Sequence, residues 1–595
     1  LGSTSLASTS AGTTTAAGTE GTTGGMTGGE STSDGTTGPG TATDPSTTDP
    51  STTTDPSTTT DPGTTTDPST TTGEPLCPEG TLLCEDGAAK VCDGQGGFSS
   101  EELCGEECVE PLGCVLCVPG STQCDGDTVL LCDDQGQGLA PAEVCDPVQG
   151  MSCDPNAGAC VGACAGLGLS YLGCDYYPTV LQQFDGYNQA PGYQWAVAVA
   201  NASDQPVQVT VTRGANTVTM VQVAAASVQL INLPWVPELS SGYGGSVVVT
   251  DGAYRLRSTG PVTVYQYNPL TVTFTNDASL LLPTNTWTGN YVVAAWPTWP
   301  FGGNAVPGLY AVVARHDGTT VKLKPSTTGG AVKPGGGVGA DGNGVISLNE
   351  GDVLQVLSNY NGDLTGTIIE ADKPVQVFGG HKCTNVPLNV TACDHLEESI
   401  FPIETLAKEY VVAPPVQVPN DQAPKGQIVR VIASEDATTL TFEPDQPGNK
   451  FLAKAGDFLQ IPPTTARFVV SADKKILVAQ YMVGQDGGFG TSDPAMLLAV
   501  NPQQWRSSYL FHAATNWQAN YVDILAPKGA NVTVDGAWIA IGASNYQVAH
   551  VKLSNQNGGN HAVSSDIPVG IGVYGVQSYG SYWYPGGLDL NLIPQ

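Results

Sequence analysis

The residues best suited to chemistry lie in one short segment between His381 and His395. It holds two histidines and two cysteines, in the phrases His-Lys-Cys from His381 and Cys-Asp-His from Cys393. Two thiolates and two imidazoles are a ligand set that zinc takes in tetrahedral sites. A disulfide between Cys383 and Cys393 would instead close a short loop, and the other cysteines indicate an oxidising compartment. We favour the disulfide, keep zinc as the alternative, and predict no metal and no cofactor.

Carboxylates close to this segment are the strongest candidates for acid–base catalysis. Glu397 and Glu398 stand beside Asp394 and could form a glycosidase pair. Adjacent glutamates more often make local hydrogen bonds or ion pairs, and we favour that interpretation. A serine hydrolase would need a nucleophile, a base and an orienting acid, but the chain has no Gly-x-Ser-x-Gly motif and only six histidines. We therefore predict a protein that is not an enzyme.

Two aromatic segments, 296–301 and 579–585, are candidates for ligand contact. Exposed aromatic faces stack on sugars or anchor protein partners, because they bury much area at little conformational cost. The alternative, which we favour, is that the rings fill the junction between neighbouring repeats. The candidate binding residues are Trp296, Trp299, Tyr582, Trp583 and Tyr584.

These residues belong to a unit that occurs four times along the last two thirds of the chain. A short strand motif recurs, beginning at Pro261, Pro374, Lys475 and Pro568. Aspartates that open the copies recur at intervals of 102, 117 and 99 residues, at Asp175, Asp277, Asp394 and Asp493. We expect one body over 165–595, with copies at about 175–276, 277–393, 394–492 and 493–595.

Each copy predicts six or seven short strands separated by turns such as Asp317-Gly318 and Asp535-Gly536. Charged residues are only 13% of the chain while Gly, Thr, Ser and Pro are abundant, which argues against long helices. The predicted fold is all-β, with four tandem antiparallel β-sandwich-like repeats. The alternative is that the four copies join into one ring-like body.

A duplicated cysteine-rich region, residues 76–164, precedes the repeats. Units of about 40 residues bury too little surface to fold alone, so three disulfides per copy would supply stability. Zinc is the minor alternative for Cys114 with Cys117 and for Cys104 with Cys108, and the pairing within each copy stays open. We predict disulfides for all sixteen cysteines: Cys77, Cys84, Cys92, Cys104, Cys108, Cys114, Cys117, Cys124, Cys132, Cys145, Cys153, Cys160, Cys164, Cys174, Cys383 and Cys393.

Residues 1–75 are almost entirely Thr, Ser, Gly, Ala, Asp and Pro. A segment with so few apolar side chains cannot offset the entropy of ordering its backbone, so we expect a disordered stalk. Its dense threonine makes it a candidate for O-linked sugars, and an unmodified tether is the alternative.

Charge and cysteine content place the protein outside the cell. A net charge of −35 and a pI near 4.2 disfavour nucleic acid and anionic lipid as partners. An even set of cysteines in a Thr-rich acidic chain indicates export. The chain has no apolar run long enough for a membrane span. We expect that a signal peptide has been removed, and a lipid anchor upstream of Leu1 stays open.

Three phrases, residues 392–398 (ACDHLEE), 492–497 (SDPAML) and 581–587 (SYWYPGG), together resemble the N-terminal domain of IgGFc-binding proteins. The resemblance spans roughly residues 171–595. It implies secreted mucus proteins of animals or surface proteins of myxobacterium-like bacteria, and the Thr-rich tether and cysteine modules fit the bacterial type better. The chain lacks the von Willebrand type D domains and the Gly-Asp-Pro-His phrase of the animal proteins, so we do not carry antibody binding over.

Together these features predict an exported adhesion or binding protein of the cell surface or matrix, favoured on a bacterial outer surface. Its stalk would add reach, its disulfides would persist outside the cell, and its repeats would offer a broad surface to a protein or glycan. One alternative is a secreted carbohydrate-active enzyme with a Ser/Thr-rich linker. Another is a structural envelope or matrix component.

Overall fold

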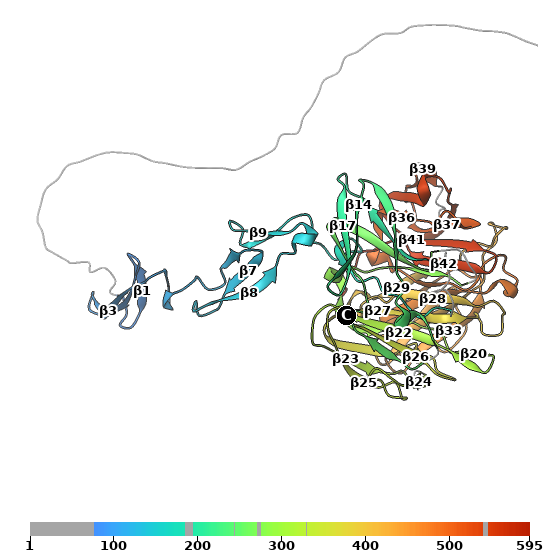
Figure 1. Ribbon diagram of the computed structural model, residues 1–595, viewed down its shortest axis with the longest axis horizontal. Coiled ribbons are helices and arrows are strands. Elements are labelled where there is room, and N and C mark those ends of the chain that lie inside the picture. The colour runs from blue at the N-terminus through green and yellow to red at the C-terminus, as the bar shows by residue number, and fades with distance from the viewer. Residues whose placement is uncertain are drawn as a thin grey trace, which may run out of the picture. The chain divides into compact units, whose positions relative to one another are not determined.

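The computed structural model describes residues 77–184, 194–242, 244–270, 275–328, 330–539 and 545–594. Over these ranges the chain is nearly all β, as predicted, and the longest helix is the four-residue α1 (Pro237–Ser240) (Figure 1). No helix in these ranges has the length and apolar character that a membrane crossing requires. The predicted stalk, residues 1–75, lies outside the described residues.

The cysteine-rich region consists of two small modules with the same disulfide pattern. In each, cysteine 1 pairs with 3, 2 with 5 and 4 with 6: Cys77–Cys92, Cys84–Cys108 and Cys104–Cys114, then Cys117–Cys132, Cys124–Cys153 and Cys145–Cys160. The strands are β1 (Leu82–Glu85), β2 (Ala88–Cys92), β3 (Phe98–Leu103), β4 (Glu107–Val109) and β5 (Gly113–Val115), then β6 (Thr122–Asp125), β7 (Thr128–Cys132), β8 (Leu139–Val144), β9 (Ser152–Asp154) and β10 (Ala159–Val161), with the 3-10 turn η1 (Pro147–Gln149) before β9.

Four large sheets follow along the chain. We call them repeats 1 to 4 and define each by the strands it contains. Repeat 1 contains β11 (Gly173–Tyr176), β12 (Trp195–Asn201), β13 (Val207–Arg213), β14 (Asn216–Val223), β15 (Ser227–Leu233), β17 (Arg255–Asn268) and β18 (Asp277–Leu280). Repeat 2 contains β19 (Thr288–Val292), β22 (Gly308–Ala314), β23 (Thr319–Lys324), β24 (Val332–Lys333), β25 (Gly344–Leu348), β26 (Val353–Ser358), β27 (Ile368–Thr384) and β28 (Asp394–Ser399). A hairpin, β20 (Trp299–Phe301) and β21 (Asn304–Val306), extends from repeat 2.

Repeat 3 contains β29 (Ala407–Val412), β30 (Gln427–Ala433), β31 (Thr438–Glu443), β32 (Phe451–Leu452), β33 (Phe458–Thr464), β34 (Phe468–Met482) and β35 (Met496–Leu498). Repeat 4 contains β36 (Arg506–His512), β37 (Ala519–Pro527), β38 (Val532–Val534), β39 (Ala537–Ile539), β40 (Tyr546–Lys552), β41 (Asn560–Gln577) and β42 (Gly580–Pro585). The 3-10 turns η3 (Thr284–Thr286), η4 (Ile403–Thr405), η5 (Gln485–Gly487), η6 (Pro502–Gln504) and η7 (Asn557–Gly559) lie in the connections.

One long strand organises each repeat: β17, β27, β34 or β41, with 14, 17, 15 and 18 residues. Its first half pairs with two strands of an outer sheet, and its second half pairs with two strands of an inner sheet. Burial changes at the same point in β17 and β34, because the first half contains buried and half-buried residues in turn while the second half is buried on both faces. The result is a sandwich-like pair of sheets that share one strand.

The recurring strand motif marks the junction between these two halves. The first strand of every repeat pairs with the long strand at this motif, and its register shifts there. The last motif residue to pair before the shift is Val262, Val375, Ile476 or Val569 in repeats 1 to 4. Proline lacks an N–H for the ladder, so a bulge beside it is a common place for it in a sheet. The motif therefore marks where the long strand leaves one sheet for the other.

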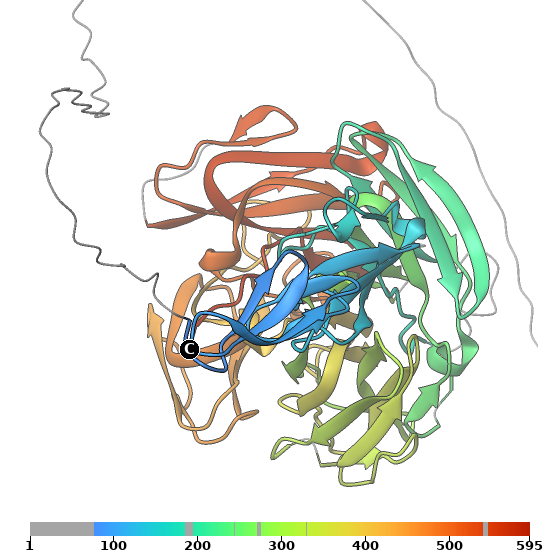
Figure 2. The same ribbon diagram turned by 90° about the vertical axis from the view of Figure 1, so that its left-hand side faces the viewer.

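The four repeats lie around a common centre, which Figure 2 shows as green, yellow, orange and red sectors. Their last strands, β18, β28, β35 and β42, lie innermost, and each packs against the next, with β42 returning to β18. One hydrophobic cluster contains buried residues of all four repeats, among them Val197, Val312, Leu477 and Val522. The sandwich-like repeats thus also form one ring-like body, the arrangement that the sequence left as the alternative.

The ring is closed by contacts between the two ends of the repeat region. The N–H of Tyr171 donates to the carbonyl of Leu588 at 3.0 Å, and the N–H of Leu590 donates to the carbonyl of Leu169 at 2.9 Å. A strand exchange joins repeats 1 and 2, since β16 (Val247–Val249) comes from the connection before β17 and pairs with β26. Each repeat is therefore held by its neighbours on both sides.

Candidate functional site

The polar residues that could do chemistry converge where the four innermost strands meet, and we call this place the hub. Its carboxylates are Asp277 of β18, Asp394, Glu397 and Glu398 of β28, and Asp493 just before β35. All five are at most 1% exposed. The sequence placed Asp277, Asp394 and Asp493 at equivalent positions of the repeats and Glu397 and Glu398 beside Asp394, but their meeting at one place depends on the ring.

Asp277 binds backbone groups from all four innermost strands. Its Oδ1 accepts from the N–H groups of Ala278 at 2.9 Å and Trp583 at 3.1 Å. Its Oδ2 accepts from the N–H groups of Glu397 and Met496, each at 3.1 Å. Since the other three partners belong to β28, β35 and β42, a single side chain links the four repeats.

Asp394 makes a second bridge of the same kind. It accepts from its neighbour His395 N at 2.9 Å, from Ser581 N at 3.0 Å and from Asn276 N. Ser581 also binds the segment before β35, because its hydroxyl donates to the carbonyl of Asp493 and accepts from the N–H of that residue at 3.2 Å. These contacts join β18, β28 and β42 and the segment that leads into β35.

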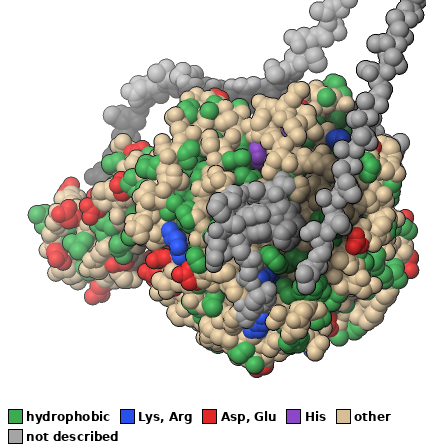
Figure 3. Space-filling view, turned by 45° about the vertical axis from the view of Figure 1, so that its right-hand side comes forward, with side chains coloured by type: hydrophobic (Ala, Val, Ile, Leu, Met, Phe, Trp, Pro, Cys, Tyr) green, Lys and Arg blue, Asp and Glu red, His purple; other side chains and the backbone are tan. Residues whose placement is uncertain are grey.

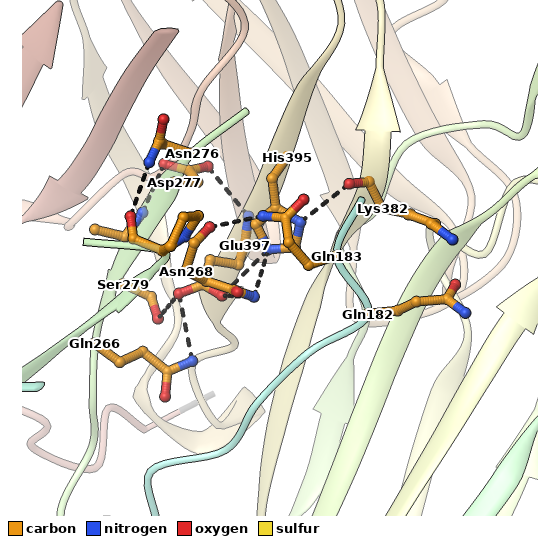
Figure 4. A network of polar contacts seen from close by, with 12 residues as sticks. Gln182, Gln183, Gln266, Asn268, Asn276, Asp277, Ser279, Lys382, His395 and Glu397 are labelled. Carbon is orange, nitrogen blue, oxygen red and sulfur yellow. Dashed lines mark hydrogen bonds and ion pairs between the residues drawn. The ribbon is translucent and has the colours of Figure 1, made fainter. Parts of the chain in front are cut away.

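Figure 4 shows a third group of contacts, centred on Glu397. Gln266 Nε2 and Ser279 Oγ donate to its Oε1 at 3.3 and 3.2 Å, and Asn268 Nδ2 donates to its Oε2 at 3.1 Å. His395 Nε2 lies 3.3 Å from the same Oε2. Three donors of repeat 1 and the imidazole of His395 therefore surround this carboxylate, as expected of a structural acceptor.

Burial shifts the titration of several hub groups. It raises the pKa of Asp277, Asp394 and Glu398 well above the usual range, and the backbone N–H groups at the two aspartates act in the opposite direction. It raises the pKa of Asp493 to about 8 and lowers the pKa of Lys425 to about 8. The contacts of Asp277 favour its ionised form, because a proton on either oxygen would face an N–H donor.

The segment that suggested zinc lies beside the hub. Cys383 and Cys393 form a disulfide, so neither offers a thiolate to a metal. Burial lowers the pKa of His381 well below its usual value, and its Nδ1 accepts from the N–H of Cys383 at 3.1 Å. Across the described ranges no group of three or more His, Cys, Asp or Glu side chains is arranged to hold a metal ion.

The five candidate aromatic residues fall into two classes. Trp296, Tyr582, Trp583 and Tyr584 are at most 2% exposed, and they lie between repeats. Tyr584 packs on Tyr265 of repeat 1 with ring centroids 4.8 Å apart, and Trp296 packs on Tyr481 of repeat 3 at 4.7 Å. These four rings fill junctions between neighbouring repeats, which is the interpretation that the sequence favoured.

Trp299 differs from the other four, because it lies on the β20–β21 hairpin and is partly exposed. Its ring stacks on Phe301 with centroids 4.5 Å apart and an angle of 23° between the planes. Phe301 is 58% exposed. Trp299 is therefore the member of the predicted set that solvent can reach, and Phe301 beside it is exposed too.

Arg430 is a residue that sequence reasoning missed. It is 2% exposed, its Nη2 lies 2.9 Å from Asp363 Oδ2 of repeat 2, and its guanidinium lies 4.4 Å from the ring centre of Trp296. A charged residue within an apolar strand such as Gln427–Ala433 is the signal that could have indicated it. It links repeats 2 and 3.

Two comparisons bear on this site. The family model described as IgGFc binding protein matches residues 277–575, half of the chain. The human protein named IgGFc-binding protein is 25% identical over 257 residues, which is 41% of this chain. The match covers only 4% of the length of that human protein. The matched family region begins at Asp277, the residue that links the four repeats.

Proposed function

The chain belongs to the IgGFc binding protein family, and from this premise we propose that it is an extracellular binding protein that presents the outer surface of its ring to a protein or glycan. The single observation that carries the proposal is that the hub, where the side chains suited to chemistry meet, is closed to solvent. Asp277, Asp394 and Glu397 accept hydrogen bonds between strands, and all five hub carboxylates are excluded from solvent. What remains for a partner is the outer surface.

Surface and covalent features support the same function. All sixteen cysteines are paired in eight disulfides, which persist in an oxidising environment outside the cell. Figure 3 shows that most of the described surface on the visible face is uncharged, with Asp and Glu side chains gathered mainly on its left-hand side. Such a surface suits recognition by shape and hydrogen bonding better than capture of a polyion.

The more specific form of the proposal is adhesion. The Thr-, Ser- and Pro-rich residues 1–75 act as a tether, and the ring attaches the protein to a cell surface or matrix, with the outer surface of a bacterium as its setting. The human relative is named for binding IgG Fc, so an Fc fragment is one partner to test. No residue carries out catalysis in this proposal.

The test uses the full chain, immobilised and exposed to three sets of probes: human IgG Fc fragment, a glycan array and detergent-solubilised envelope proteins. Saturable binding to any one of them that is lost when the ring is heat-unfolded supports the proposal. Capture of only further copies of the same chain would favour a structural matrix component. Release of free sugar from the array would indicate the alternative, a carbohydrate-active enzyme, and would refute the absence of catalysis.

A further inference from the structure

Grooves open at the same place on three successive seams, where a seam is the surface between neighbouring repeats. The groove between repeats 1 and 2 has a volume of about 300 Å³, that between repeats 2 and 3 about 330 Å³, and that between repeats 3 and 4 about 940 Å³. The second and third grooves are lined by the first strand of a repeat just past its register shift, and the first groove is lined by Tyr177, the residue that follows β11. The charged side chains of the three grooves can therefore be compared position by position.

One position near these grooves is equivalent in the three repeats: Asp175, Asn290 and Glu409, the residue that follows the register shift. At the first seam Asp175 is neutralised, because both of its carboxylate oxygens accept from Arg255 at 2.9 Å. Arg255 also binds Glu350 at 2.7 Å. The guanidinium that lines this groove is thus held by carboxylates of the protein itself.

The second seam has lysines in its groove. Lys324 and Lys475 line it together with acidic side chains, among them Glu370. Lys475 Nζ donates to the carbonyl of Glu404 at 3.0 Å. This groove is smaller than the third, and both lysines and several acidic side chains line it together.

Among the described residues, the charged side chains that line the third groove have no ionic partner. Glu409, Glu443 and Arg467 line the groove, and none of them forms a salt bridge with any described residue. Glu409 accepts from Ser471 Oγ and Tyr546 Oη, both at 3.4 Å, which is long for such hydrogen bonds. The carboxylates are therefore free to accept better hydrogen bonds.

The guanidinium of this groove is held in position from the other side of the seam. Arg467 Nη2 lies 3.0 Å from His550 Nε2, and His550 Nδ1 lies 2.7 Å from Asp523 Oδ1. Because arginine can only donate, Nε2 is the acceptor and the Nδ1 proton goes to Asp523. Asp523 also accepts from Tyr574 Oη at 3.0 Å. This relay orients Arg467 before any ligand arrives.

The lining combines these polar groups with apolar faces. Phe442, Pro444 and Val548 line the groove next to Thr441, Ser471 and Tyr546. Hydroxyl groups of a sugar both donate and accept, and its ring faces are apolar, so they need acceptors, donors and apolar contact in the same site. Pockets for small ligands span roughly 300–1,000 Å³ and place a few polar groups on apolar walls.

We propose that the groove between repeats 3 and 4 binds a neutral oligosaccharide, with Glu409 and Glu443 as acceptors for its hydroxyls and Arg467 as a donor. The proposal rests on the proposed binding function and names the ligand class of one site. An acidic glycan is disfavoured by the two carboxylates and by the net charge of −35. A cationic peptide would meet the fixed guanidinium of Arg467.

The experiment measures binding of the full chain to neutral hexaoses of glucose, mannose and N-acetylglucosamine by calorimetry. Sialyllactose and hexalysine serve as the anionic and cationic probes. We expect at least one neutral hexaose to bind, and Glu409→Gln and Arg467→Met each to weaken it tenfold or more. Glu370→Gln, in the groove of the neighbouring seam, is the matched control and should leave the affinity within twofold.

Three results would overturn the proposal: no neutral hexaose binds, the groove variants bind as well as the unaltered chain, or sialyllactose or hexalysine binds in preference. The thermal midpoint of each variant shows that the ring is intact. If no neutral hexaose binds while the immobilised chain still captures one of its partners, the groove assignment fails and the proposed binding function stands.

Discussion

Replacing Asp277 is the most direct test of how the four repeats are held together. The Asp277→Ala variant removes an acceptor that serves three backbone N–H groups on other innermost strands, those of Glu397, Met496 and Trp583. These groups lie in a hub closed to solvent, so water cannot replace the carboxylate without opening the ring. The expected result is a large loss of stability.

The magnitude follows from the number of donors left without an acceptor. A buried donor that loses its partner costs roughly 1–3 kcal/mol, so three of them cost about 3–9 kcal/mol. The variant also no longer has to bury a carboxylate, which offsets part of this loss. We therefore expect the free energy of unfolding to fall by about 5 kcal/mol. Since folded proteins are stable by only about 5–15 kcal/mol, most of the ring's stability is at stake.

The Asp277→Asn variant is the sharper comparison, because it keeps the shape of the side chain. Its amide nitrogen can only donate, so it would face two of the N–H groups that the carboxylate accepts. We expect Asp277→Asn to be no better tolerated than Asp277→Ala. Both variants of the full chain are compared by thermal unfolding at one scan rate and by urea unfolding at pH 7.

The matched control is Asp473→Asn, because this exposed aspartate accepts from one backbone N–H, that of Thr439 at 2.8 Å. It should change the unfolding midpoint far less than either change at Asp277. If Asp277→Asn unfolds within about 1 kcal/mol of the unaltered chain, a neutral side chain suffices at this position and the reasoning about the four-strand carboxylate bridge is refuted.

Three further predictions concern other parts of the ring. Serine at both Cys383 and Cys393 should cost about 3 kcal/mol in urea unfolding, from the entropy of a loop with a sequence separation of 10, and equal midpoints would contradict this. Burial lowers the pKa of His512 to about 4, so stability should fall as the pH drops from about 6.5 to 4, by up to about 3 kcal/mol, because only the unfolded state takes up the proton. His512→Gln should lose that part of the acid dependence, and an unchanged pH profile would count against it. Leu590→Ala, at a site 1% exposed, should cost about 2–5 kcal/mol and speed hydrogen exchange at the Tyr171 end of the ring, whereas Leu592→Ala, 60% exposed, should do neither.

Local patterns in the sequence have a direct structural meaning in these repeats. The aspartates that precede the strand motif, Asp372, Asp473 and Asp566, each accept from a backbone N–H in or directly before a neighbouring strand of their own repeat. The motif itself coincides with the register shift in all four repeats. Such features are predictable because they depend on residues close together within one sheet.

Aromatic segments show where the sequence left a choice open. Tyr582 and Trp299 stand in similar runs of aromatic and small residues, yet Tyr582 is fully buried and Trp299 lies on an exposed hairpin. The local sequence does not distinguish rings that pack against another repeat from rings that face solvent. Only the position of the neighbouring repeat separates the two outcomes.

The sequence alone determined that the chain is all-β, that its strands recur in four copies and that its cysteines pair, because strand propensity, periodicity and cysteine number are properties of the chain itself. The tertiary structure decided that the copies close into one ring, that Asp277 binds three strands up to 306 residues away, and that the groove at Glu409 is open while Asp175 is ion-paired. These facts depend on which repeats become neighbours, and a hydrogen bond or a groove between distant segments leaves no local mark in the residues that form it.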